Sequence, residues 1–130
     1  NFVKTMIKLG STRDKLTVIF DQIGTPTYAA DLAKAIMTVI DSKEFVTGTY
    51  HFSDEGVCSW YEFAKAINKL YGINGCEVLP LETKDYPDDT PRPAYSVLNK
   101  AKIKNTYKVS IPHWYESLEK CIRILKEQEI

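Results

Sequence analysis

Residues 20–33, FDQIGTPTYAADLA, join a predicted strand to a predicted helix through a loop of the kind that binds ligands. Residues 16–20 are apolar and rich in β-branched side chains, which is typical of a buried strand, and residues 24–26 (GTP) interrupt the run. Beyond the loop, apolar residues recur at helical spacing, with Thr27 as the expected N-cap and Asp31 in the first turn. The order of strand, loop and helix favours an α/β nucleotide-handling fold, in which ligands bind beyond the carboxyl ends of strands.

Capping signals and periodicity predict the other elements. Ser59 and Glu62 form a capping box that begins a helix, which Gly72 ends. We also expect a helix over 2–9 ended by Gly10, strands over 49–53 (TYHFS) and 77–81, a surface loop over 82–93, and a last helix that begins near Pro112 with an apolar stripe of Trp114, Leu118, Cys121 and Leu125.

The charge balance excludes some classes of partner. The 130 residues carry 17 basic and 17 acidic side chains, so the zero net charge argues against nucleic acid and against an anionic membrane surface. Lys100, Lys102, Lys104 and Lys108 lie close together without interleaved aromatic residues, and we expect a solvated helix face. With no signal peptide and no run that could span a bilayer, residues 1–130 are expected to be one soluble, cytoplasmic domain or part of a larger one.

The cysteines and histidines form no metal or redox motif. Cys58, Cys76 and Cys121 are far apart and lack CxxC spacing, which favours a reduced cytosolic setting. His51, in an expected strand, and His113, near an expected helix start, have no second ligand at metal spacing. We interpret both histidines as structural.

Four strings resemble one family. The string DQIGTPTYAADLA resembles the corresponding stretch of the dTDP-4-dehydrorhamnose reductases, extended short-chain dehydrogenases that reduce a deoxysugar nucleotide with NADPH, and residues 1–6 (NFVKTM), 48–63 (GTYHFSDEGVCSWYEF) and 92–98 (RPAYSVL) follow in the family's order. The resemblance covers essentially the whole chain. It implies an α/β chain that is the carboxyl-terminal, substrate-binding part of a Rossmann-like fold, with strands that complete the sheet of a parent protein.

The resemblance also implies an activity for that parent, the reduction of dTDP-4-dehydro-L-rhamnose to dTDP-L-rhamnose. The glycine-rich GxxGxxG turn is missing, so NADPH would be bound by an absent amino-terminal part, and a chain beginning at Asn1 looks like a fragment that is inactive alone. Some bacterial members form dimers helped by Mg²⁺, which makes a homodimer of the parent compatible with the resemblance, but no residue here identifies a magnesium ligand. A regulatory homologue like the methionine adenosyltransferase subunit, and a reductase or epimerase of another nucleotide sugar, are the alternatives.

Arg92 is the leading candidate for ligand binding. A guanidinium fork followed by a proline can grip a pyrophosphate with two parallel hydrogen bonds. The resemblance implies the same role, because relatives commonly place an arginine of this late loop on the substrate diphosphate. A surface salt bridge to Asp85, Asp88 or Asp89 is the alternative.

Four residues in two other segments are also candidates for the substrate site. Asn1 and Phe2 begin a helix whose free N–H groups suit a phosphate, and relatives use this turn against the substrate phosphates, although Asn1 can merely cap the helix. Gln22 and Thr25 offer amide and hydroxyl groups to a base, ribose or sugar, or else hold a tight turn with their own side chains.

Aromatic residues near these segments offer stacking surfaces. Tyr95 lies close to Arg92 in RPAYS and is the aromatic candidate for the substrate site. Tyr28 and Trp60 could also stack on a thymine, although core packing accounts for most aromatic residues in such a chain.

Tyr61 and Lys65 match the YxxxK pattern in which a dehydrogenase tyrosine donates a proton and a lysine lowers its pKa. The helical wheel places both opposite the apolar face that contains Trp60, Phe63 and Ile67. We therefore expect solvent-facing neighbours and no catalytic residue in this chain.

Overall fold

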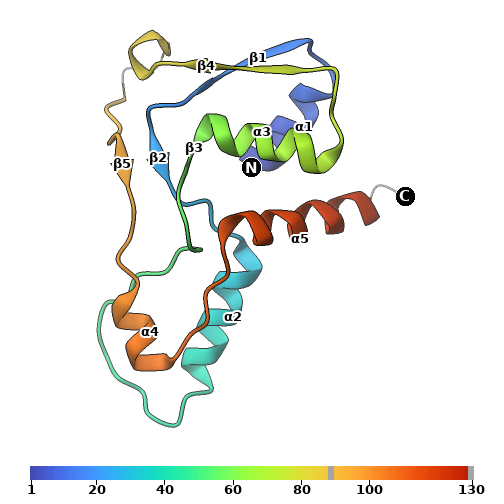
Figure 1. The fold of residues 1–130 in the computed structure, drawn as a ribbon. Coiled ribbons are helices and arrows are strands. Elements are labelled where there is room, and N and C mark those ends of the chain that lie inside the picture. The colour runs from blue at the N-terminus through green and yellow to red at the C-terminus, as the bar shows by residue number, and fades with distance from the viewer. Residues whose placement is uncertain (88–89, 129–130) are drawn as a thin grey trace.

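Two regions make up the α/β fold of the computed structural model, which describes residues 1–87 and 90–128 (Figure 1). The upper region begins with β1 (Lys15–Ile19) and β4 (Glu77–Leu81), which pair in parallel. Helices α1 (Phe2–Gly10), α3 (Trp60–Tyr71) and α5 (Trp114–Glu127) lie on one side of these strands. We call β1, β4, α1, α3 and α5 the upper region.

Helix α3 is the centre of the upper region. Its capping box is formed, because the Ser59 hydroxyl accepts from the Glu62 N–H at 3.1 Å and the Glu62 carboxylate accepts from the Ser59 N–H at 2.8 Å. Gly72 ends the helix with a φ of 91°, a left-handed conformation that costs glycine little. Ile67 is completely buried, and the apolar side chains around it come from α1, β1, α3 and α5.

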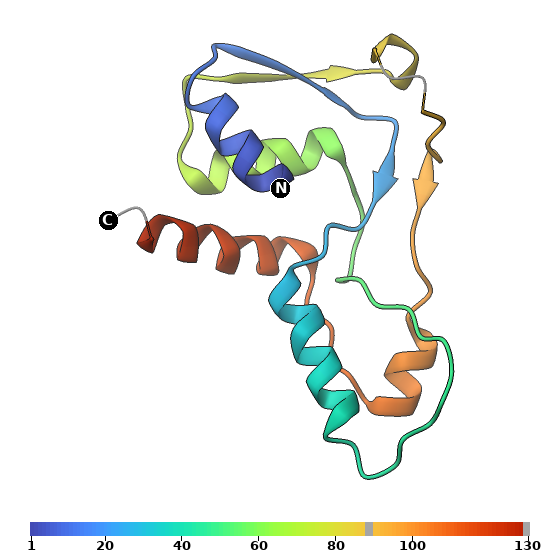
Figure 2. The same ribbon diagram turned by 180° about the vertical axis from the view of Figure 1, so that it is seen from behind.

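A small second sheet joins three segments that lie far apart in the sequence. β2 (Ile23–Gly24) pairs antiparallel with β3 (Cys58–Ser59) and parallel with β5 (Tyr95–Ser96). Figures 1 and 2 show these short strands beside α3. The pairing of β2 with β5 places the loop after β2 next to the segment that contains Arg92, so both segments can contact one ligand.

The lower region consists of α2 (Ala29–Ile40), α4 (Ala101–Tyr107) and residues 41–57, which surround the lower end of the molecule (Figure 2). Asp54 and Glu55 tie this region together. The Asp54 carboxylate accepts from the Tyr28 N–H at 3.0 Å, and the Lys100 ammonium donates to the Asp54 carbonyl at 2.8 Å and pairs with Glu55 at 3.0 Å. Lys104 forms a second ion pair with Glu55.

The environment shifts the two carboxyl groups in opposite directions. Burial raises the pKa of Asp54. Burial alone would also raise the pKa of Glu55, but hydrogen bonds from Lys104 and Lys100 outweigh it and hold that pKa below the usual value. Glu55 is also bonded through its backbone, because its N–H donates to the Pro112 carbonyl and its carbonyl accepts from the Trp114 N–H. The starts of α2, α4 and α5 therefore converge on one dipeptide.

Several sequence predictions are confirmed and others are wrong; Gly10, for example, belongs to α1, and Ser11 is the C-cap. The strand over 77–81, the capping box and the helix starting at Phe2 are present. The strand expected over 49–53, which includes His51, has no pairing partner among the described residues, so it stays a prediction for the sheet of a parent protein. Thr27 is not the N-cap of α2; Tyr28 is, and the distant Asp54 binds its N–H. The lysines do not form one solvated face, since Lys100 is buried.

The predicted loop after β4 is largely irregular, with one short 3₁₀ turn, η1 (Thr83–Asp85). Asp88 and Asp89, two of the three salt-bridge partners considered for Arg92, lie outside the described residues.

Candidate functional site

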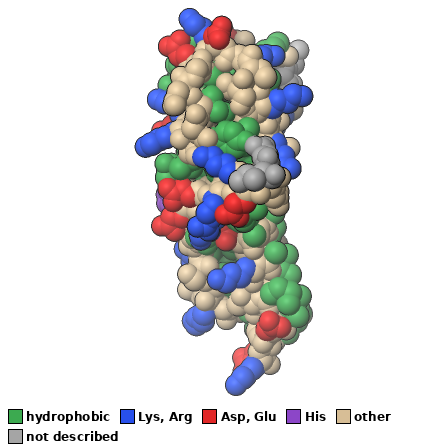
Figure 3. All heavy atoms as spheres, turned by 90° about the vertical axis from the view of Figure 1, so that its right-hand side faces the viewer, with side chains coloured by type: hydrophobic (Ala, Val, Ile, Leu, Met, Phe, Trp, Pro, Cys, Tyr) green, Lys and Arg blue, Asp and Glu red, His purple; other side chains and the backbone are tan. Residues whose placement is uncertain are grey.

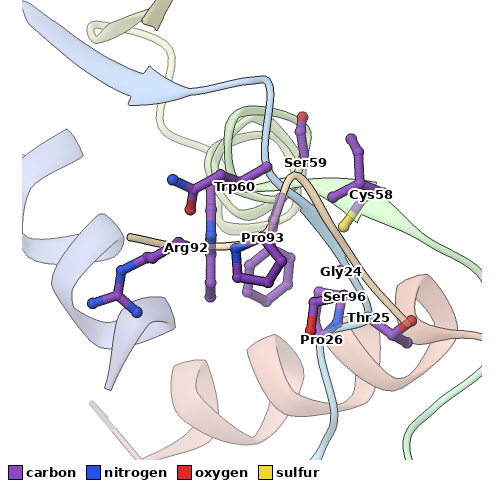
Figure 4. A pocket seen from close by; sticks show the side chains of 12 residues that line it. Gly24, Thr25, Pro26, Cys58, Ser59, Trp60, Arg92, Pro93 and Ser96 are labelled. Atoms are coloured by element: carbon purple, nitrogen blue, oxygen red, sulfur yellow. The ribbon is translucent and has the colours of Figure 1, made fainter. Parts of the chain in front are cut away.

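A cleft of about 290 Å³ lies where the second sheet meets the start of α3 (Figure 4). We call it the central cleft. One side is the β2–α2 loop and another is the segment that enters β5. Its lining residues are Gln22, Ile23, Gly24, Thr25, Pro26, Cys58, Ser59, Trp60, Phe63, Arg92, Pro93 and Ser96.

Trp60 lines the central cleft and also two neighbouring cavities. As the first residue of α3 it is 44% exposed, and its ring lies 4.9 Å from that of Phe2 between centroids. It also lines a cavity of about 360 Å³ next to β1 and another of about 540 Å³ next to α5. The exposed indole can therefore stack on a flat ligand, which is one of the two roles that the sequence leaves open for it.

Arg92 supplies the charge of the site. It lines both the central cleft and the cavity next to β1, and it is the one charged side chain among the described residues that line these two spaces. Figure 4 shows its side chain next to Trp60 and Pro93, with Thr25, Pro26 and Ser96 toward the other end of the cleft. A guanidinium beside an aromatic wall can bind a phosphate while a base stacks nearby.

Gln22 and Thr25 shape the cleft through bonds to other segments. The buried Gln22 amide donates to the Thr83 hydroxyl at 3.1 Å, and that hydroxyl donates to Asp21 at 2.7 Å. The Thr83 hydroxyl and N–H lower the pKa of Asp21. The Thr25 hydroxyl donates to the Gly56 carbonyl at 2.8 Å. The side chains of Gln22 and Thr25 thus hold the turn, which is one of the two roles predicted for them. The Thr25 hydroxyl oxygen can still accept a hydrogen bond from a ligand.

Asn1 and Phe2 lie at the edge of the same group of cavities. The Asn1 side chain accepts from the Lys4 N–H at 3.1 Å and so caps α1. Phe2 packs against the rings of Trp60 and Phe63 and lines both neighbouring cavities. Tyr95, in contrast, is 66% exposed and is not among the described residues that line these cavities. The structure brings the candidates other than Tyr95 around Trp60.

Cys58, Pro93 and Ser96 line the cleft although the sequence analysis did not select them. These residues reach the cleft only because β3 and β5 flank β2. A sequence alone does not reveal strand pairings that are two residues long. Burial, with a smaller contribution from Glu62, raises the pKa of the Cys58 thiol to about 12, which makes it a poor nucleophile.

Tyr61 and Lys65 lie away from the three cavities, whose described lining residues include neither. The Lys65 ammonium lies 5.1 Å from the centroid of the Tyr61 ring, and Lys65 is exposed. Tyr61 is half-buried against the edge of the core, so it is less solvated than the helical wheel predicted. The pair nevertheless has no access to a ligand in the central cleft.

Residues 1–87 and 90–128 contain no cluster of metal ligands and no helix suited to crossing a membrane. No group of three or more His, Cys, Asp and Glu side chains there is arranged to hold a metal ion. None of the helices in this described part combines the length and the apolar character that crossing a membrane requires.

Known proteins resemble this chain along nearly its whole length. The spore coat polysaccharide biosynthesis protein SpsK of Bacillus subtilis is 43% identical over 123 residues, which are 95% of this chain and 42% of SpsK. A crystal structure of a dTDP-4-dehydrorhamnose reductase from Clostridium acetobutylicum is 45% identical with a TM-score of 0.89, covering 97% of this chain and 44% of that one.

A second solved relative is the dTDP-4-dehydrorhamnose reductase of Bacillus anthracis in complex with NADP, which is 42% identical with a TM-score of 0.83 over 92% of this chain and 41% of that one. The chain thus spans less than half the length of these relatives. The family model "RmlD substrate binding domain" matches residues 1–127. The cleft around Trp60 and Arg92 therefore lies in a chain that belongs to the RmlD substrate-binding domain family.

Proposed function

We propose that this chain is the carboxyl-terminal, substrate-binding part of a longer NADPH-dependent reductase, here called the parent protein, that converts dTDP-4-dehydro-L-rhamnose to dTDP-L-rhamnose. The observation that carries the proposal is Arg92, the one charged side chain among the described residues of the central cleft, next to the exposed indole of Trp60. A nucleoside diphosphate needs a cation and an aromatic surface close together.

Different lining residues suit different parts of the ligand. Arg92 would bind the diphosphate through its two-pronged guanidinium, and Trp60 with Phe2 would offer ring faces to the base. The β2–α2 loop, with Gln22 and Thr25 already fixed by hydrogen bonds, would face the sugar. Tyr95 stays a candidate at the exposed edge of β5.

The chain's contribution to the reaction is orientation. NADPH supplies the hydride when it is bound, and the residues that hold it lie in the remainder of the parent, since this sequence contains no GxxGxxG turn. By fixing the diphosphate, the central cleft would hold the C4 carbonyl within reach of that hydride, an effect that supplies several kcal/mol of a barrier.

The test is NADPH oxidation by the parent protein with dTDP-4-dehydro-L-rhamnose, with the 130-residue chain alone as the control. We expect turnover by the parent and none by the chain. A parent that binds dTDP but does not oxidise NADPH would contradict the proposal in favour of a regulatory homologue or another nucleotide sugar. Turnover by the chain alone would contradict the assignment of the chemistry to the remainder of the parent.

A further inference from the structure

Hydrogen bonds join the segment that follows β1 to the turn η1 that follows β4. The Thr83 N–H donates to both oxygens of the Asp21 carboxylate, at 3.0 and 3.1 Å, and the Thr83 hydroxyl donates to the same carboxylate at 2.7 Å. The Gln22 amide nitrogen donates to the Thr83 hydroxyl oxygen at 3.1 Å. We call these three residues the Asp21–Thr83–Gln22 network. The network ties two neighbouring side chains to one residue that lies 62 positions after Asp21.

The number of hydrogens on each group fixes the direction of every bond in this network. The Thr83 hydroxyl, and then the Thr83 N–H, lower the pKa of Asp21, so its carboxylate is ionised at neutral pH and can only accept. A hydroxyl has a single hydrogen, and Thr83 donates it to Asp21. The Thr83 oxygen can therefore only accept from Gln22. The nitrogen of the Gln22 amide, and not its oxygen, must face Thr83.

The orientation of this amide matters because of where Gln22 lies. Gln22 is buried, and it lines both the central cleft and the cavity next to β1. An amide group is planar, so a nitrogen held by Thr83 also fixes the direction of the carbonyl oxygen. A ligand in either space is thus offered a hydrogen-bond acceptor in a fixed direction.

We infer that Asp21 and Thr83 are positioning residues, which turn the Gln22 amide so that its carbonyl oxygen accepts a hydrogen bond from the nucleotide sugar. This inference rests on the proposed function. A nucleotide sugar carries suitable donors in the hydroxyl groups of its sugar and in the imide N–H of thymine, whereas its ionised diphosphate can only accept. An amide that is already oriented favours binding, because the ligand does not have to order it.

Removal of the Thr83 hydroxyl tests the inference on the parent protein. Thr83→Val keeps the shape of the side chain and the N–H that bonds to Asp21, but it releases the Gln22 amide. We expect dTDP-L-rhamnose, titrated by calorimetry, to bind about 3- to 10-fold more weakly, which corresponds to one hydrogen bond. Thr83→Ser keeps a hydroxyl and should restore the affinity. Unchanged affinity in Thr83→Val would overturn the inference.

The matched control is Thr12→Val. It removes an exposed hydroxyl that donates to the Lys8 carbonyl at the end of α1, and Thr12 is not among the described residues that line the central cleft or the cavity next to β1. We expect this variant to bind dTDP-L-rhamnose as the unchanged parent does. An equal loss of affinity in Thr12→Val and Thr83→Val would overturn the inference, because the effect would then not depend on Gln22.

A double-mutant cycle separates positioning from a direct or purely structural role of Thr83. Gln22→Met removes the amide, so adding Thr83→Val to it should weaken binding by less than about twofold. Asp21→Ala, which frees the Thr83 hydroxyl hydrogen, should likewise weaken binding only when Gln22 is present. A further loss of the same size with and without Gln22 would overturn the inference, because Asp21 and Thr83 would then act independently of the amide.

Titration with dTDP identifies the ligand group that donates to Gln22. A loss in Thr83→Val with dTDP-L-rhamnose alone assigns the donor to a sugar hydroxyl, and an equal loss with dTDP assigns it to the nucleoside; both results support the positioning role. NADPH oxidation is measured separately. A parent in which Thr83 and Gln22 are coupled in binding, but which does not oxidise NADPH, would contradict only the proposed function.

Discussion

The upper region and the lower region of the molecule are held together by different forces. The upper region encloses its own apolar core around Ile67, with side chains from α1, β1, α3 and α5. The lower region has Asp54, Glu55, Lys100 and Lys104 at its junction, while the apolar side chains of α2 are largely exposed (Figure 3). The difference shows that the upper region is stabilised mainly by hydrophobic burial within this chain, whereas the lower region buries fewer apolar side chains, Ala35, Ile103 and Tyr107 among them, and is positioned largely by polar contacts.

The central cleft lies where the two regions meet. Trp60 belongs to α3 of the upper region, and the β2–α2 loop leads into the lower region. Gly56 bonds to Thr25 and Asp54 bonds to Tyr28, so the turn over 54–56 holds both ends of that loop. Changes at the polar junction are therefore expected to affect the geometry of the cleft.

The largest expected effect follows removal of core volume. Ile67→Ala should cost about 2–5 kcal/mol, because Ile67 is completely buried and the truncated side chain leaves a cavity. Native-state hydrogen exchange in peptides covering 60–71 of the parent measures this loss. Ile124→Ala on the partly exposed side of α5 is the control and should cost much less. An equal loss of stability in both variants would contradict the conclusion that the upper region is held by a tightly packed core.

A smaller effect confined to the lower region is expected from Lys100→Met. The substitution removes the cation that bonds to the Asp54 carbonyl and pairs with Glu55, which should cost about 1–3 kcal/mol. Hydrogen exchange should quicken in peptides covering 29–40 and 101–107 and stay unchanged in 60–71. The matched control is Lys34→Met, which changes an exposed side chain of α2. Faster exchange throughout the chain would show that the two regions do not differ in this way.

Glu55 gives the smallest effect, and its sign depends on pH. Its pKa is below the ordinary 4.5 in the folded state, so the stabilisation is fully present above pH 4.5 and is lost as the pH falls through the folded pKa. Parent protein with Glu55 should therefore melt at a higher temperature than Glu55→Gln at pH 7, by an amount equivalent to about 1 kcal/mol, and the difference should shrink as the pH falls below 4.5 and disappear below the folded pKa. A difference that grows on acidification would contradict this assignment.

The sequence predicted elements whose signals are local. Ser59 and Glu62 are three residues apart, so the start of α3 could be read directly, and Asn1 is likewise the N-cap of α1. The N-cap of α2 could not be predicted in this way, because the side chain that binds the Tyr28 N–H belongs to Asp54, 26 residues away. The strand over 49–53 is not confirmed for a related reason, since β-propensity does not supply a pairing partner and no described segment pairs with these residues.

The candidate site was predicted in part for the same reasons. Side-chain chemistry and position after a strand selected Gln22 and Thr25, and the family resemblance supported Arg92 and Phe2. The structure gathers all four around Trp60. For Trp60 the sequence leaves stacking and core packing open, and the exposure of the indole in the first turn of α3 favours stacking. Cys58 and Ser96 enter the cleft only through the pairing of β2 with β3 and β5, which has no sequence signal.

Calorimetric titration of dTDP into the parent protein tests the central claim most directly. Arg92→Ala should weaken binding about 10- to 100-fold, since charge-assisted hydrogen bonds contribute about 1.5–3 kcal/mol, while Arg123→Ala on the exposed side of α5 should bind as the unchanged parent does. Arg92→Lys should recover only part of the affinity, because an ammonium cannot form the two-pronged contact. An Arg92→Ala variant with unchanged dTDP affinity would contradict the assignment of the central cleft as the diphosphate site.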